Sequence, residues 1–117
     1  MNPILLVDDE PGVVTLMARF LMLANYEVRA AFTGQEALDL MANPDLHFAC
    51  VVTDLVMPGV TGIEVGMQAQ LQGIPVVYVS GFAHTGGIGR ILAKPFTEAA
   101  LLNAVRSATW QFEDAGR

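Results

Sequence analysis

Cysteine and charged residues are both scarce in this chain. The single cysteine, Cys50, lies within an apolar run, which excludes an internal disulfide, and we interpret it as a small core residue. Charged residues make up 15% of the chain, against about 25% in an average domain. Lys and Arg together number 6 and the net charge is −6. Direct nucleic-acid binding is therefore not expected, because it needs clustered cations.

Long hydrophobic runs are also missing, although the composition is apolar. No run approaches the roughly 18 residues of a membrane span, and the N-terminus lacks the basic region of a signal peptide. We therefore expect no membrane insertion and a cytoplasmic location. A hydrophobic fraction of 53% in 117 residues predicts one domain, residues 1–117, with a large core. The apolar surplus also suggests association, so a homodimer is one expected form.

Apolar runs alternate with helical patterns along the chain. Short runs predict strands at residues 3–7, 26–31, 48–53, 75–79 and 90–93. Helical spacing predicts helices at about 11–24, 33–41, 61–73 and from 97 onward. Thr33 with Glu36, and Thr61 with Glu64, form capping-box patterns. This alternation predicts an α/β fold with a parallel sheet and right-handed crossovers.

Two segments carry more specific predictions. Within the helix at 61–73, Ile63, Met67 and Leu71 recur at positions i, i+4 and i+8, and we expect them to face the core. Residues 82–89 are rich in glycine, which is less favourable than alanine in a helix by up to about 1 kcal/mol per residue. We therefore predict a loop or a single turn there.

Polar side chains stand where the predicted strands end. Asp8 and Asp9 follow the first strand, and Asp54, Ser80 and Lys94 follow the third, fourth and fifth. Taken singly, such residues are ordinary caps and turn residues. The carboxyl ends of parallel strands lie at one edge of the sheet, where ligands bind in folds of this class. Their joint occurrence therefore indicates a functional site.

The residue types at this edge favour phosphoryl chemistry. Close carboxylates repel one another unless a cation lies among them, and oxygen ligands favour Mg²⁺. An aspartate beside Mg²⁺ can attack phosphorus, which makes Asp54 a candidate phosphoryl acceptor. The Lys94 ammonium and the Ser80 hydroxyl would stabilise the charge on the transferred group.

The chain resembles a response-regulator receiver domain of two-component signalling from Ile4 to about Phe112. The matching motifs are Val7-Asp8-Asp9-Glu10, Asp54-Leu55-Val56-Met57-Pro58-Gly59 with Gly62, Val79-Ser80-Gly81, and Lys94-Pro95-Phe96. The resemblance implies a flavodoxin-like, doubly wound, five-stranded parallel sheet in the order 2-1-3-4-5. Here the helix between the fourth and fifth strands would be reduced or absent.

The same resemblance implies roles for single residues. Asp54 would accept phosphate from a sensor histidine kinase or a histidine phosphotransfer protein. Asp8, Asp9, Asp54 and the backbone carbonyl of Val56 would bind Mg²⁺. Ser80 would be the switch hydroxyl, and Lys94 would contact the phosphate and precede a cis peptide bond to Pro95. Such a domain signals, and it is not an enzyme acting on an external substrate, although it catalyses its own phosphorylation and dephosphorylation.

The sequence departs from the family at the positions that transmit the signal. Ile91 stands where family members carry an aromatic switch residue, and Phe82 or Tyr78 could replace it, although Tyr78 is better explained as a core residue. Val56 and Phe82 occupy positions that flank the path of the hydrolytic water in the family. We hypothesise that these two apolar side chains slow phosphate loss.

The sequence leaves two alternatives open. The chain could be a degenerate receiver that acts only as a protein-interaction module, as the shortened segment and Ile91 would allow. It could also be a small Mg²⁺-dependent phosphatase that forms an aspartyl phosphate, although such enzymes carry their nucleophile on the first strand. The domain could act alone or belong to a larger protein, such as a hybrid kinase.

Overall fold

The structure is a computed structural model that describes residues 2–81 and 90–115, with side chains described as far as residue 110. Its five strands form one parallel sheet in the order β2-β1-β3-β4-β5. The strands are β1 (Ile4–Val7), β2 (Val28–Ala31), β3 (Cys50–Asp54), β4 (Val76–Ser80) and β5 (Arg90–Ala93). The predicted strand order is confirmed.

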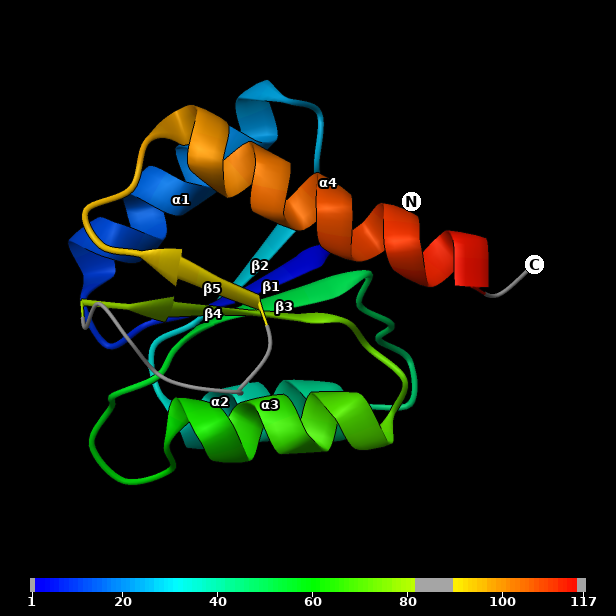
Figure 1. The fold of residues 1–117 in the computed structure, drawn as a ribbon. Coiled ribbons are helices and arrows are strands. Elements are labelled where there is room, and N and C mark those ends of the chain that lie inside the picture. Colours follow the sequence, from blue (N-terminus) through cyan, green and yellow to red (C-terminus); the bar gives the residue numbers. More distant parts are fainter. Residues whose placement is uncertain (1, 82–89, 116–117) are drawn as a thin grey trace.

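Four helices within the described residues cover the sheet from both sides. They are α1 (Pro11–Leu23), α2 (Gly34–Ala42), α3 (Gly62–Leu71) and α4 (Glu98–Ala115). Figure 1 shows α1 and α4 on one face of the sheet and α2 and α3 on the other. The predicted doubly wound α/β fold is confirmed. No described helix is long and apolar enough to cross a membrane.

The core consists of two layers, one on each face of the sheet. Leu6, Val52 and Val77 pack beneath α1 and α4, whereas Leu5 and Val51 pack on the side of α2 and α3. Successive strand residues point to opposite faces, and both faces are covered by helices. This explains why every residue of β1, β3 and β4 is buried, and why these strands read as continuous apolar runs.

The two predicted capping boxes form to different extents. At α3, the Glu64 amide donates to Thr61 Oγ1 at 3.3 Å and the Thr61 amide donates to Glu64 Oε2 at 2.9 Å. At α2, the Glu36 amide donates to Thr33 Oγ1 at 3.0 Å, but the Glu36 carboxylate accepts from the amide of Phe32 at 3.1 Å. Because Glu36 reaches one residue too far back, the box at α2 is only half formed.

The prediction for the buried face of α3 is wrong. Ile63, Met67 and Leu71 are 43%, 58% and 83% exposed. The residues that α3 buries are mostly small: Gly62, Val65, Gly66 and Ala69. A methyl group on Gly62 would collide with the carbonyl of Asp54, and one on Gly66 would collide with the Tyr78 hydroxyl. The helix thus lies against the sheet at a distance that only its small residues allow.

Some predictions concern residues 82–89, between β4 and β5. The loss of a full helix there and both roles suggested for Phe82 lie outside the described residues. Tyr78 is buried on the α2 and α3 side of the sheet, which agrees with its interpretation as a core residue. Ile91, on the edge strand β5, is exposed.

Candidate functional site

The end of β1 places Asp8 inside the protein. Asp8 is fully buried, and its amide donates to the carbonyl of Ala31 at 3.2 Å. Its Oδ1 accepts from the amide of Glu10 at 2.9 Å, directly before α1 begins. The neighbouring Asp9 is exposed. The amide of Glu10, the residue before α1, therefore orients one carboxylate, while the next carboxylate, that of Asp9, is open to solvent.

The end of β3 delivers Asp54 to the same edge. Asp54 is only 7% exposed, and its Oδ1 accepts a long hydrogen bond of 3.5 Å from the amide of Val56. Gly62, the first residue of α3, packs against the carbonyl of Asp54, and its amide donates to the carbonyl of Leu55 at 3.1 Å. The start of α3 thus holds the backbone that carries the Asp54 side chain.

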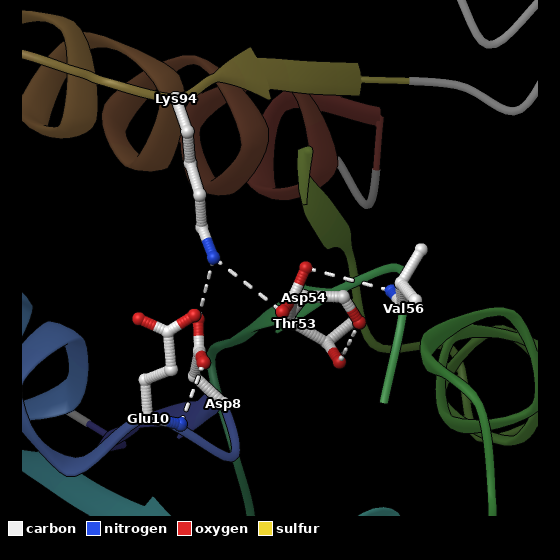
Figure 2. Close-up of polar contacts among 6 residues, drawn as sticks. All are labelled: Asp8, Glu10, Thr53, Asp54, Val56 and Lys94. Carbon is white, nitrogen blue, oxygen red and sulfur yellow. Dashed lines mark hydrogen bonds and ion pairs between the residues drawn. The ribbon is translucent and has the colours of Figure 1, made fainter. Parts of the chain in front are cut away.

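The end of β5 brings a cation to the two buried acids. Lys94 Nζ lies 3.1 Å from Asp8 Oδ2 and 3.4 Å from Asp54 Oδ2. Figure 2 shows the lysine reaching down from β5 between the two carboxylates. The Lys94 amide donates to the carbonyl of Ser80 at 2.8 Å, which ties the ends of β4 and β5 together. The peptide bond from Lys94 to Pro95 is cis, as the resemblance implied.

Burial and charge act in opposite directions at this site. Burial raises the pKa of Asp54, and the charge of Asp8 raises it further, while Lys94 and the Val56 amide lower it without cancelling the increase. Burial lowers the pKa of Lys94, but its hydrogen bond and ion pair with Asp8, together with Asp54, outweigh burial and raise it. The site therefore holds two close carboxylates with one ammonium between them, and it retains excess negative charge.

The acidic residues are close enough together to hold a metal ion. One carboxylate oxygen each from Asp8, Asp9 and Asp54 lies within 4.8 Å of the other two. Hard divalent cations such as Mg²⁺ bind oxygen ligands, and carboxylates are among those ligands in proteins. The cluster can therefore bind such an ion, and the residues present fit the metal that the sequence predicts.

The remaining predicted residues lie around this cluster. Ser80 is buried at the carboxyl end of β4, where the neighbouring Val79 pairs with Asp54. Val56 follows Asp54 with its side chain exposed. The structure thus brings Asp8, Asp9, Asp54 and Lys94 together and places Ser80 at the same edge.

The sequence did not reveal an apolar groove beside the lysine. The groove has a volume of about 350 Å³ and is lined by Val13, Leu16, Lys94, Pro95 and Phe96. Val13 and Leu16 lie on α1, where helical spacing predicted a helix but no groove. The exposure of Leu16 depends on the tertiary structure, in which the loop after β5 lies beside α1.

The chain is similar to a large group of known proteins. Residues 4–106 match the family described as the response regulator receiver domain. Over 65 residues, or 55% of this chain, it is 40% identical to the transcriptional regulatory protein SrrA of Staphylococcus aureus. This stretch corresponds to 26% of the length of SrrA, so the match spans about a quarter of that relative.

Solved structures share the whole fold. A CheY-like receiver domain protein of Methanospirillum hungatei JF-1 superposes with a TM-score of 0.85 over 98% of both chains, at 23% identity. The chemotaxis response regulator CheY4 of Vibrio cholerae superposes with a TM-score of 0.79 at 28% identity. That match covers 92% of this chain and 98% of CheY4.

Proposed function

Because the chain belongs to the response regulator receiver domain family, we propose that Asp54 is the residue that accepts a phosphoryl group. Receiver domains are signalling domains and not metabolic enzymes. The observation that carries the proposal is the position of Asp54, a nearly buried carboxylate inside an acidic cluster and within reach of Lys94. A core aspartate without such partners would be costly to keep ionised.

The proposed donor is a phosphohistidine on a sensor histidine kinase or a histidine phosphotransfer protein. A carboxylate oxygen of Asp54 attacks phosphorus, the P–N bond breaks, and the imidazole leaves with the electron pair of that bond. Lys94 and Ser80 then contact the phosphoryl oxygens, which requires Lys94 Nζ to exchange Asp54 Oδ2 for the phosphoryl group. Bound by Asp8, Asp9, Asp54 and the carbonyl of Val56, Mg²⁺ would supply further positive charge to these oxygens.

The acceptor role is tested with a small phosphodonor. Incubation with acetyl phosphate and Mg²⁺ should give one phosphoryl adduct by intact mass, stable in acid and labile in base. Asp54→Asn should abolish the adduct. The matched control is Asp39→Asn, at an exposed aspartate of α2 that accepts a hydrogen bond from Gln35, and it should retain the adduct. An adduct that persists in Asp54→Asn would show that another residue is the acceptor.

The apolar groove beside Lys94 is the proposed contact for the protein donor. The groove adjoins the side chain of Lys94, which forms an ion pair with Asp54, and its apolar lining offers a surface that a helical partner can bury. Leu16→Arg should slow phosphorylation by a phosphotransfer protein and leave phosphorylation by acetyl phosphate unchanged. Equal rates from both donors would remove the groove from the proposal.

A pure interaction module remains a second candidate, and the exposed Ile91 at the edge of the sheet favours it. Ile91 lies on β5 in place of the aromatic residue that relays the phosphorylated state in the family. Complete lack of an adduct with acetyl phosphate, in protein that is folded and binds Mg²⁺, would favour this alternative. Turnover of external phosphate esters would instead favour a phosphatase.

A further inference from the structure

Two glycines on one face of α3 make unusually close contacts with the sheet. Gly62 and Gly66 are four residues apart, so they lie above one another on the same side of the helix. A methyl group at Gly62 would meet the carbonyl of Asp54, and one at Gly66 would meet the hydroxyl end of Tyr78. The first contact touches the proposed phosphoryl acceptor itself, and the second lies one helical turn further along.

Tyr78 is the residue against which the second glycine rests. It is 2% exposed, and burial raises the pKa of its hydroxyl. Within the described residues its hydroxyl takes part in no hydrogen bond. A buried hydroxyl without a partner is costly, and a phenylalanine would avoid that cost. The tyrosine is therefore poorly explained as a contributor to core stability alone.

We propose that Tyr78 is a positioning residue that sets the distance of α3 from the sheet and, through Gly62, the position of Asp54 in the acidic cluster. Gly66 of α3 contacts Tyr78, and Gly62 contacts the backbone of Asp54. These two contacts fix the distance of the helix from the sheet at two points one turn apart. The Gly62 amide also donates to the carbonyl of Leu55, so a displacement of α3 pulls on the residue next to Asp54.

The consequence concerns the affinity for the metal. The oxygens of Asp8, Asp9 and Asp54 lie within 4.8 Å of one another, and Mg²⁺ demands nearly ideal geometry. If α3 is displaced, the Asp54 carboxylate moves relative to the acids that follow β1. This inference rests on the proposed function only in taking the acidic cluster as a Mg²⁺ site.

The experiment is a double-mutant cycle on the full chain, with Mg²⁺ affinity measured by titration calorimetry and stability measured by urea unfolding. Gly66→Ala forces a methyl group against the ring, and we expect the Kd for Mg²⁺ to rise at least fivefold. Tyr78→Leu withdraws the far end of the ring, and it should also weaken binding. In the double variant the added methyl takes up part of the vacated space, so the Kd should return to within about twofold of the wild type.

Gly12→Ala is the matched control, because a methyl group at this helical glycine of α1 meets nothing within 4 Å. It should leave the Kd unchanged. Variants that lose stability but keep the wild-type Kd would show that the contact serves packing only and would overturn the proposal. If Gly66→Ala does not fold, a double variant that binds Mg²⁺ no better than Tyr78→Leu has the same meaning.

The failure of the proposed function would look different. Wild-type protein that binds no Mg²⁺, or binds it equally well after Asp54→Asn, would remove the metal site itself. Wild-type binding that depends on Asp54 but not on Gly66 or Tyr78 would remove only the positioning role.

Discussion

Replacing Lys94 with methionine should strongly destabilise the metal-free protein. The ammonium lies 3.1 Å from a carboxylate oxygen of Asp8 and 3.4 Å from one of Asp54. Methionine keeps most of the side-chain volume and removes the charge. The substitution therefore leaves two close, buried carboxylates with no cation between them.

The magnitude follows from the distances and the burial. At an effective dielectric constant of about 20, each attraction amounts to about 5 kcal/mol before desolvation is subtracted. Removing one partner of a buried ion pair typically costs about 3–5 kcal/mol. The Lys94 side chain is 22% exposed, so water can reach the carboxylates in the variant. We therefore expect a loss of about 3 kcal/mol in the free energy of unfolding at pH 7.

The pH dependence provides an internal check. The ion pair with Asp54 contributes stability only while Asp54 is ionised, so its contribution is present at neutral pH and is lost as the pH falls through the folded pKa of Asp54. Burial and Asp8 place that pKa above the usual value of 3.8. The part of the difference between the wild type and Lys94→Met that comes from Asp54 should therefore be lost by about pH 3, so the total difference should be clearly smaller there than at pH 7.

Urea unfolding with and without Mg²⁺ is the assay. Saturating Mg²⁺ should stabilise Lys94→Met more than the wild type, because in the variant no ammonium competes with the ion for the carboxylates of Asp8 and Asp54. Arg106→Met, at an exposed cation on α4, is the control and should change stability by less than about 0.5 kcal/mol. A loss below about 1 kcal/mol at pH 7, or a loss of the same size at pH 3, would refute the role of Lys94 as the cation that offsets the two buried acids.

Further predictions concern the packing of α3 and the response to alkali, all measured by urea unfolding. Tyr78→Phe should leave the free energy of unfolding unchanged or raise it by up to about 1 kcal/mol, because it removes a buried hydroxyl that forms no hydrogen bond with any described residue. Leu71→Ser should cost less than about 0.5 kcal/mol, because its side chain is exposed, whereas Val65→Ala should cost about 2 kcal/mol through the cavity it leaves. Thr61→Ala should cost about 1 kcal/mol, because it removes the cap of α3. The pKa of Tyr78 and that of Lys94 are both raised, so the folded state holds these protons longer and stability should fall as the pH rises above about 10. A larger loss from Leu71→Ser than from Val65→Ala would contradict the packing prediction. A free energy of unfolding that stays constant above about pH 10 would contradict the alkaline prediction.

The alternation of strands and helices and the candidate residues of the site could be predicted from the sequence because both follow from short-range patterns, whereas the order of the strands was implied by the resemblance to the receiver family. A continuous apolar run indicates a strand that is covered on both faces, and the residue after the run must lie at the edge of the sheet. The pattern alone therefore predicts that Asp8, Asp54 and Lys94 lie at the same edge of the sheet. The half-formed capping box at α2 shows the limit of such patterns. The Glu36 carboxylate accepts from the amide of Phe32, one residue before the Thr33 amide that a complete box requires.

The face of α3 could not be predicted in the same way, because two sets of residues repeat with the same helical period. Large apolar side chains recur at Ile63, Met67 and Leu71, and small ones recur at Gly62 and Gly66. Periodicity cannot choose between them. The choice depends on how closely the helix approaches the sheet. That distance is determined by two groups on the strands β3 and β4, namely the carbonyl of Asp54 and the ring of Tyr78. The ion pairs of Lys94 are likewise tertiary, because the residues they join are far apart in the chain and become neighbours only when β1, β3 and β5 share a sheet edge.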